Sequence, residues 1–174
     1  MRSVIRTPLT VLIGAALALA GCASDAADEP APGESTVTSG SDAGAAPDAL
    51  AILDMLYPER DVPPAQLAVA DLTLGDGAVA TAGQRAVVQY WGVRWSDGGT
   101  FDASWERGEP FTFVLGTGQV ISGWDIGVEG MQVGGRRVLV IPPDLAYGDR
   151  GVGNVIGPGE TLVFVVDLVD TGAS

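Results

Sequence analysis

Short runs of β-branched and aromatic residues, separated by turn signals, fill residues 65–170 and constrain the fold more than any other feature. The runs lie at 65–74, 85–95, 111–115, 136–142 and 161–170. Several alternate apolar with polar residues, as strands with one buried face do. This pattern predicts about five antiparallel strands, and the segment SDGGTF (96–101) between the second run and the third is typical of a hairpin loop.

One segment breaks the strand pattern and predicts a helix of about two to three turns. Four apolar residues recur there at i, i+3, i+7 and i+10, and they are Ile121, Trp124, Val128 and Met131. Ser122, with Asp125 three residues later, is typical of a helix cap. A short helix across one face of an antiparallel sheet is an α+β fold, in which Trp124 points into the sheet as core or as part of a site.

Residues 1–21 have the form of a secretory signal peptide. Arg2 and Arg6 precede an apolar run that is shorter than the ~20 residues needed to span a bilayer. The run ends in Leu-Ala-Gly-Cys, which looks like the bacterial lipoprotein signal, and its Cys22 is the only cysteine of the chain. In such signals the cysteine is lipidated and becomes the first mature residue. The sequence therefore predicts a protein outside the cytoplasm that reaches a bacterial membrane only through lipid on Cys22.

Residues 22–62 are expected to form the lipidated cysteine and a disordered acidic linker, and residues 63–174 the folded domain. The first part of the linker is small, acidic and rich in Pro, Gly, Ser and Thr, so it buries too little apolar surface to fold. Leu50, Leu53 and Leu56 lie at helix-like spacing. They favour one or two helical turns that pack on the domain.

The charge of the chain argues against nucleic acid as a partner. Nine basic residues less Arg2 and Arg6 of the signal leave seven, against 22 acidic residues, so the mature net charge is −15. Phosphate backbones repel a chain of this charge. Most of it has a simpler interpretation, which is the solubility of an exported protein.

The composition also removes most kinds of catalysis. The chain has no histidine and no lysine, which excludes an imidazole base, a Schiff base and a P-loop. Lipidation of the only cysteine leaves no thiolate nucleophile, and no acidic cluster has the spacing of a metal site. No cofactor is expected. An enzyme of this composition works by shape and desolvation rather than by proton transfer.

Three segments together resemble the FKBP-type peptidyl-prolyl cis–trans isomerases. They are VQYWGVRWSDGGTFDAS, PFTFVLGTGQVISGWDIGVEGMQVGGRRVLVIPPDLAYG and TLVFVVDLVD, and the resemblance covers about residues 66–171. It implies a half-open antiparallel sheet of five to six strands wrapped round one short α-helix. An apolar pocket between sheet and helix is expected to bind proline.

The resemblance also implies the residues of that pocket. The catalytic set is Tyr90, Asp102, Ile121, Trp124 and Tyr147. The substrate-binding walls are Phe101, Phe111, Val120, Ile156 and Phe164. Trp124 is expected under the proline ring, with the Ile121 N–H and the Tyr147 hydroxyl as donors to a substrate carbonyl. Asp102 is expected to be held by Tyr90 and Arg107, although a simple surface ion pair is the alternative.

Three classes of function remain open at this point. The first is an active isomerase that acts on Xaa–Pro bonds of exported proteins, as a monomer with proline-containing polypeptides as clients. The second is a module that binds proline segments or macrolides of the tacrolimus or rapamycin type with little turnover. The third is a scaffold, which the retained pocket residues disfavour. The glycine-rich loop at 148–161, which overhangs the pocket in the family, is expected to be mobile.

Overall fold

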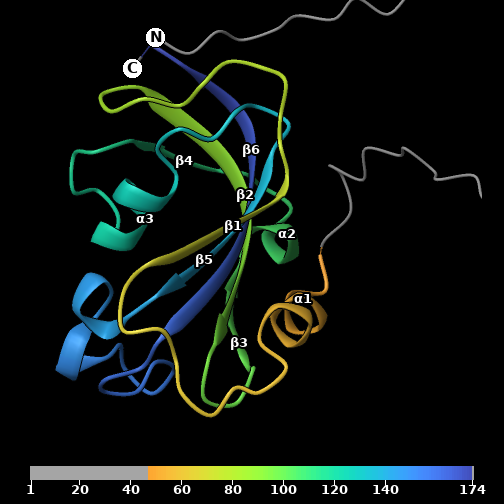
Figure 1. Cartoon of the computed structure of the whole chain (residues 1–174). Coiled ribbons are helices and arrows are strands. Elements are labelled where there is room, and N and C mark those ends of the chain that lie inside the picture. The colour runs from red at the N-terminus through yellow and green to blue at the C-terminus, as the bar shows by residue number, and fades with distance from the viewer. Residues whose placement is uncertain (1–46, 174) are drawn as a thin grey trace, which may run out of the picture. The chain divides into compact units, whose positions relative to one another are not determined.

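The strand pattern builds a six-stranded antiparallel sheet (Figure 1) in the computed structural model, which describes residues 47–173. The strands are β1 (Ala68–Thr73), β2 (Arg85–Arg94), β3 (Thr100–Ala103), β4 (Phe111–Val114), β5 (Arg136–Ile141) and β6 (Leu162–Gly172). They follow the order β1-β5-β6-β2-β3, and β4 pairs with β2 beside this path. The predicted antiparallel sheet is confirmed, and the SDGGTF segment supplies the turn of the β2–β3 hairpin and the start of β3.

The helical elements are short. They are α1 (Ala49–Leu56), α2 (Ser104–Arg107), α3 (Ser122–Gly127) and the 3-10 turns η1 (Pro143–Leu145) and η2 (Gly148–Arg150). In the described part of the chain, none is long and apolar enough to cross a membrane. The predicted signal peptide, Cys22 and the linker up to residue 46 lie outside the described residues.

Alternation along the central strands gives the sheet two apolar faces. On β6, Phe164 and Val166 are buried in one core together with Trp124 of α3. Val163, which precedes Phe164, and Val165, which lies between Phe164 and Val166, are buried in a second core on the other face. Because successive side chains of a strand point to opposite faces, both faces of this sheet need a cover, and α3 and α1 each contribute to one.

Helix α1 belongs to the second core. The Asp48 carboxylate accepts a hydrogen bond from the Ala51 N–H at 3.0 Å and caps the helix. Leu53 is fully buried, and Tyr57 after the helix packs edge-on against Trp95 at 5.1 Å between ring centroids. These residues lie at the end of 22–62, the segment expected to hold the lipidated cysteine and a disordered linker. The one or two helical turns expected around Leu53, packed on the domain, are present, so this end of the segment is continuous with the folded domain.

Helix α3 differs from the prediction in length and in its cap. It has six residues, and Val128 and Met131 are buried in the turns that follow it. Asp125 does not cap the helix with Ser122. Its carboxylate instead accepts hydrogen bonds at 2.8 Å from the N–H groups of Gly116 and Gly118. The loop before α3 is thereby tied to the helix that carries Trp124.

Replacing Leu53 with alanine is expected to lower the free energy of unfolding by about 2–4 kcal/mol, because it leaves a cavity between α1 and the sheet. Urea unfolding followed by tryptophan fluorescence measures the effect. The matched control is Met55→Ala on the same helix, where the side chain is 65% exposed and the expected change is within about 0.5 kcal/mol. Equal stability of the two variants would contradict the packing of α1.

Candidate active site

A cavity of about 240 Å³ is lined by residues from four strands, from α3 and the loop before it, and from the connection between η1 and η2. The lining residues are Tyr90, Phe101, Asp102, Phe111, Gln119, Val120, Ile121, Trp124, Tyr147 and Phe164. Nine of these ten residues are among those expected from the sequence. The fold brings them together from segments that lie far apart in the chain. The cavity is mainly aromatic and aliphatic, with a few polar groups at one side, which is typical of a ligand site.

Trp124 and Phe164 are the most buried residues of the lining, each 4% exposed. Four aromatic rings surround the Trp124 indole. The rings of Tyr90 and Phe164 stand edge-on to the indole at 5.1 and 5.2 Å between centroids, and those of Phe113 and Phe111 at 5.6 and 6.1 Å. Edge-to-face pairs of this kind stabilise the cluster beyond simple burial and hold the indole in one orientation.

The glycines that flank Trp124 explain how such a large residue fits there. A methyl group added at Gly123 would lie 2.4 Å from Ile141 Cγ2, and one at Gly127 would lie 2.7 Å from Leu139 Cδ2. Both glycines therefore let α3 lie directly on β5. With the backbone so close to the sheet, Trp124 fills the space beside the contact rather than pushing the helix away.

Three residues form a polar edge to the cavity. The Tyr90 hydroxyl donates a hydrogen bond to one oxygen of the Asp102 carboxylate, and the Arg107 guanidinium donates to the other. Arg107 Nη2 also donates to the Tyr90 oxygen at 2.8 Å, and its Cζ lies 5.4 Å from the centre of the Tyr90 ring. The expected contacts of Asp102 with Tyr90 and Arg107 are both present, so Arg107 is more than the partner in a simple surface ion pair.

The surroundings of the two cavity tyrosines keep their hydroxyls protonated. Burial raises the pKa of Tyr90 to about 12, and the hydrogen bond to Asp102 adds to the effect. Burial and the negative charge of Asp102 raise the pKa of Tyr147 as well. Neither hydroxyl is therefore suited to act as a base near neutral pH, but both are able to donate hydrogen bonds.

The buried indole N–H of Trp124 has no acceptor within the described residues. The same holds for the backbone N–H of Ile121, just before α3, and for the hydroxyl of Tyr147, whose residue is 41% exposed. Ile121 and Tyr147 both line the cavity, so a ligand carbonyl is a suitable acceptor for either donor. Across residues 47–173, no group of three or more His, Cys, Asp or Glu side chains is placed to hold a metal ion.

Ile156 and Gln119 depart from the expected lining. Ile156 is 5% exposed and packs in the core with Trp124, but it does not line the cavity. Val152 and Ile156 exchange two backbone hydrogen bonds, at 2.8 and 3.1 Å, and the resulting tight turn directs Ile156 into the core. Gln119 lines the cavity and accepts a hydrogen bond from the Val114 N–H at 3.0 Å. The only indication in the sequence that Gln119 lines the cavity was its position next to Val120, a residue expected in the wall.

Known proteins share both the sequence and the fold around this cavity. The family model of FKBP-type peptidyl-prolyl cis–trans isomerases matches residues 77–169. The chain is 65% identical over 108 residues to an FK506-binding protein of Streptomyces anulatus, an alignment that covers 62% of this chain and 87% of that protein. It is 53% identical over 91 residues to the peptidyl-prolyl cis-trans isomerase FPR2 of Saccharomyces cerevisiae, which covers 52% of this chain and 67% of that protein.

A solved structure agrees with these matches. The crystal structure of AtFKBP13 superposes with a TM-score of 0.57 at 40% sequence identity, and the match covers 64% of this chain and 97% of that one. The short helix α3 and all the residues that line the cavity lie within residues 77–169, the segment that the family model matches, whereas β1 precedes this segment. The chain belongs to the family of FKBP-type peptidyl-prolyl cis–trans isomerases.

Proposed function

We propose that this isomerase acts on Xaa–Pro bonds of exported proteins while lipid on Cys22 holds it at the outer side of a bacterial membrane. The aromatic cavity, with the donors of Ile121 and Tyr147 that are unpaired within residues 47–173, is the observation that carries the isomerase part of the proposal. The signal-like residues 1–21 and the single cysteine directly after them support the location. The acidic, proline-rich segment after Cys22 then serves as a tether between lipid and domain.

The apolar cavity supplies the first part of the mechanism. Rotation about an Xaa–Pro bond has a barrier of ~18–20 kcal/mol, because amide resonance is lost in the twisted state. The planar amide is the more polar form, so removal of water by the rings of Trp124, Phe101 and Phe164 disfavours it relative to the twisted form. Lowering the barrier by ~5 kcal/mol corresponds to an acceleration of several thousand-fold.

Fixed hydrogen bonds supply the second part. The proline ring lies on Trp124, and the Ile121 N–H and the Tyr147 hydroxyl hold substrate carbonyls while the bond rotates. Tyr90, Asp102 and Arg107 bind one another and keep the edge of the cavity in shape. Donors that are already oriented need no reorganisation at the transition state. No step requires a proton transfer, which agrees with a chain that has neither histidine nor lysine.

The same cavity is proposed to bind macrolides of the FK506 type. The relative from Streptomyces anulatus is named an FK506-binding protein, and the family is known by that ligand as well as by its proline substrates. A macrolide that fills the cavity over Trp124 would exclude a peptide and inhibit the isomerase. A module that binds without turnover is the alternative, and the activity assay below distinguishes the two.

Replacing Tyr147 with phenylalanine is expected to lower kcat/KM for an Ala-Leu-Pro-Phe type peptide by roughly five- to tenfold, as the loss of one hydrogen bond does. The assay follows cis-to-trans relaxation of the peptide with the chain from residue 23 onward. Tyr57→Phe, outside the cavity, is the matched control and should keep full activity. A folded wild-type chain that gives no acceleration on several peptides would contradict catalysis and leave the binding module.

Raising the pH above 10 is expected to weaken the fold through Tyr90. Its pKa is about 12 in the folded chain and ordinarily 10, so its contribution to stability is fully present below pH 10 and lost as the pH rises through 12. Urea unfolding at pH 8 and pH 11 measures the loss, which should be smaller in Tyr90→Phe than in the wild type. The same loss in both proteins would show that Tyr90 is not the group responsible.

Replacing Cys22 with serine is expected to abolish lipidation, because the chain has no other thiol. The full chain, expressed in a bacterial host and labelled with radioactive palmitate, should carry the label and enter the detergent phase on Triton X-114 partitioning. Cys22→Ser should do neither, and Ser24→Ala should behave as the wild type. Label on the serine variant, or none on the wild type, would contradict the anchor.

A further inference from the structure

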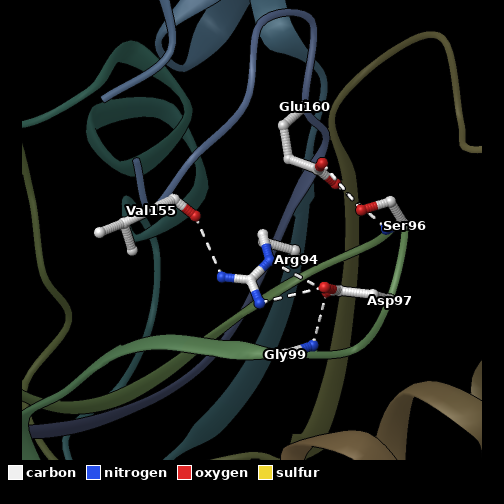
Figure 2. A network of polar contacts seen from close by, with 6 residues as sticks. All are labelled: Arg94, Ser96, Asp97, Gly99, Val155 and Glu160. Atoms are coloured by element: carbon white, nitrogen blue, oxygen red, sulfur yellow. Dashed lines mark hydrogen bonds and ion pairs between the residues drawn. The ribbon is translucent and has the colours of Figure 1, made fainter. Parts of the chain in front are cut away.

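A polar network joins the turn after β2 to the glycine-rich loop at 148–161 (Figure 2). Arg94, the last residue of β2, lies at its centre. Its Nε and Nη2 donate to the Asp97 carboxylate at 3.0 and 3.1 Å, and its Nη1 donates to the Val155 carbonyl at 3.0 Å. The Asp97 carboxylate also accepts from the Gly99 N–H at 2.8 Å, which fixes its orientation. One guanidinium therefore links the turn after β2 to Val155, which lies 61 residues from Arg94 in the chain.

A second tie lies five residues further along the same loop. The Glu160 carboxylate accepts hydrogen bonds from the Ser96 N–H at 3.1 Å and from the Ser96 hydroxyl at 2.9 Å. Ser96 is in the same turn as Asp97, as Figure 2 shows. The turn after β2 thus holds the loop at Val155 through a guanidinium and at Glu160 through a carboxylate.

The tied segment is continuous with the cavity. The Gly159 N–H donates to the Gly148 carbonyl at 3.0 Å, and Gly148 directly follows Tyr147, which lines the cavity. Ile156 packs in the core that contains Trp124. Val155 is thus joined to Tyr147 along the loop backbone and through the hydrogen bond between Gly159 and Gly148.

The loop has little rigidity of its own. Four of the nine residues from 151 to 159 are glycines, which restrict the backbone least of all residues. Its internal bonds are three in the turn from Val152 to Ile156, of which one joins the Val155 N–H to the Val152 carbonyl, and the contact of Gly159 with Gly148. Contacts from outside the loop are thus needed to fix its place over the sheet, and the Arg94 contact reaches its middle.

The exposure and charge of the Arg94–Asp97 pair suit a role in fixing the loop rather than in stabilising the whole fold. The Arg94 side chain is 22% exposed and that of Asp97 is 58% exposed, so the ion pair contributes little to global stability. The hydrogen bond to Asp97 raises the pKa of Arg94, and the guanidinium lowers the pKa of Asp97. Both groups therefore stay charged around neutral pH, and the donor to the Val155 carbonyl is a permanent cation.

We propose that Arg94 is a positioning residue of the isomerase: it holds the loop at 148–161 and, through it, the Tyr147 hydroxyl in the place where that hydroxyl meets a substrate carbonyl. The inference rests on the proposed function, because it gives the loop its role in that reaction. Arg94 does not line the cavity and acts only through the loop. The same contact holds the backbone of Val155, whose side chain is exposed on the loop.

The test compares Arg94→Gln with Arg85→Gln in the full chain kept in detergent. Arg85 begins the strand that Arg94 ends, and it makes an exposed ion pair with Asp170 at 2.7 Å, so it is a matched control without the loop contact. Hydrogen–deuterium exchange of the Val152, Ile156 and Gly159 amides reports the loop. Relaxation of the proline peptide reports kcat and KM separately.

Arg94→Gln should speed exchange of these three amides about tenfold and raise KM roughly three- to tenfold with kcat within twofold, because a bond to the bound substrate is weakened. Arg94→Lys should recover part of both effects, since an ammonium is able to donate to the Val155 carbonyl. In the Tyr147→Phe background, Arg94→Gln should add less than a twofold loss, because both changes remove the same contact.

Other outcomes would overturn the inference. Exchange in Arg94→Gln equal to that in Arg85→Gln would show that the loop does not depend on Arg94. Losses that multiply with those of Tyr147→Phe would show that Arg94 acts by another route. Failure of the proposed function would appear differently, as absence of activity in the wild-type chain, and the exchange of the three amides alone would then decide whether Arg94 holds the loop.

Discussion

Gly123 and Gly127 let the backbone of α3 lie directly on the side chains of Ile141 and Leu139 of β5, and the whole site is arranged around that contact. The helix is only six residues long, so it has little stability of its own and depends on the packing of Trp124 among four aromatic rings. The bonds from two loop amides to Asp125 then fix the loop that leads into the helix. The position of the Ile121 N–H at the cavity follows from these contacts.

A rigid apolar cavity with a hydrogen-bonded edge suits a reaction that needs no acid or base. Tyr90, Asp102 and Arg107 satisfy one another, and the raised pKa of Tyr90 keeps its hydroxyl a donor over the whole physiological range. The Ile121 N–H, the Tyr147 hydroxyl and the Trp124 indole N–H have no acceptor among the described residues, so the proposed mechanism assigns the first two to substrate carbonyls. The lack of histidine and lysine, which excludes most other enzymes, therefore places no limit on this one.

Local pattern and family motif predicted much of this arrangement, and long-range contacts account for what they missed. Alternation along 161–170 placed β6, and the resemblance placed Trp124 at the cavity. The role of Asp125 was missed because its partners come from a loop outside the helix. Ile156 was expected in the cavity wall, but a tight turn directs it into the core. The sequence could not predict the contact between Arg94 and the loop, because the partner of Arg94 is the backbone carbonyl of Val155, 61 residues away.

The central claim, that an Xaa–Pro bond rotates while bound over Trp124, is tested most directly by NMR exchange spectroscopy on a proline peptide together with the labelled protein. The account predicts a cis–trans exchange rate that increases in proportion to the protein concentration. It also predicts that the Trp124 indole and the Ile121 amide are among the most shifted protein signals. Exchange at the uncatalysed rate, or fast exchange with shifts confined to residues outside the cavity, would contradict the account.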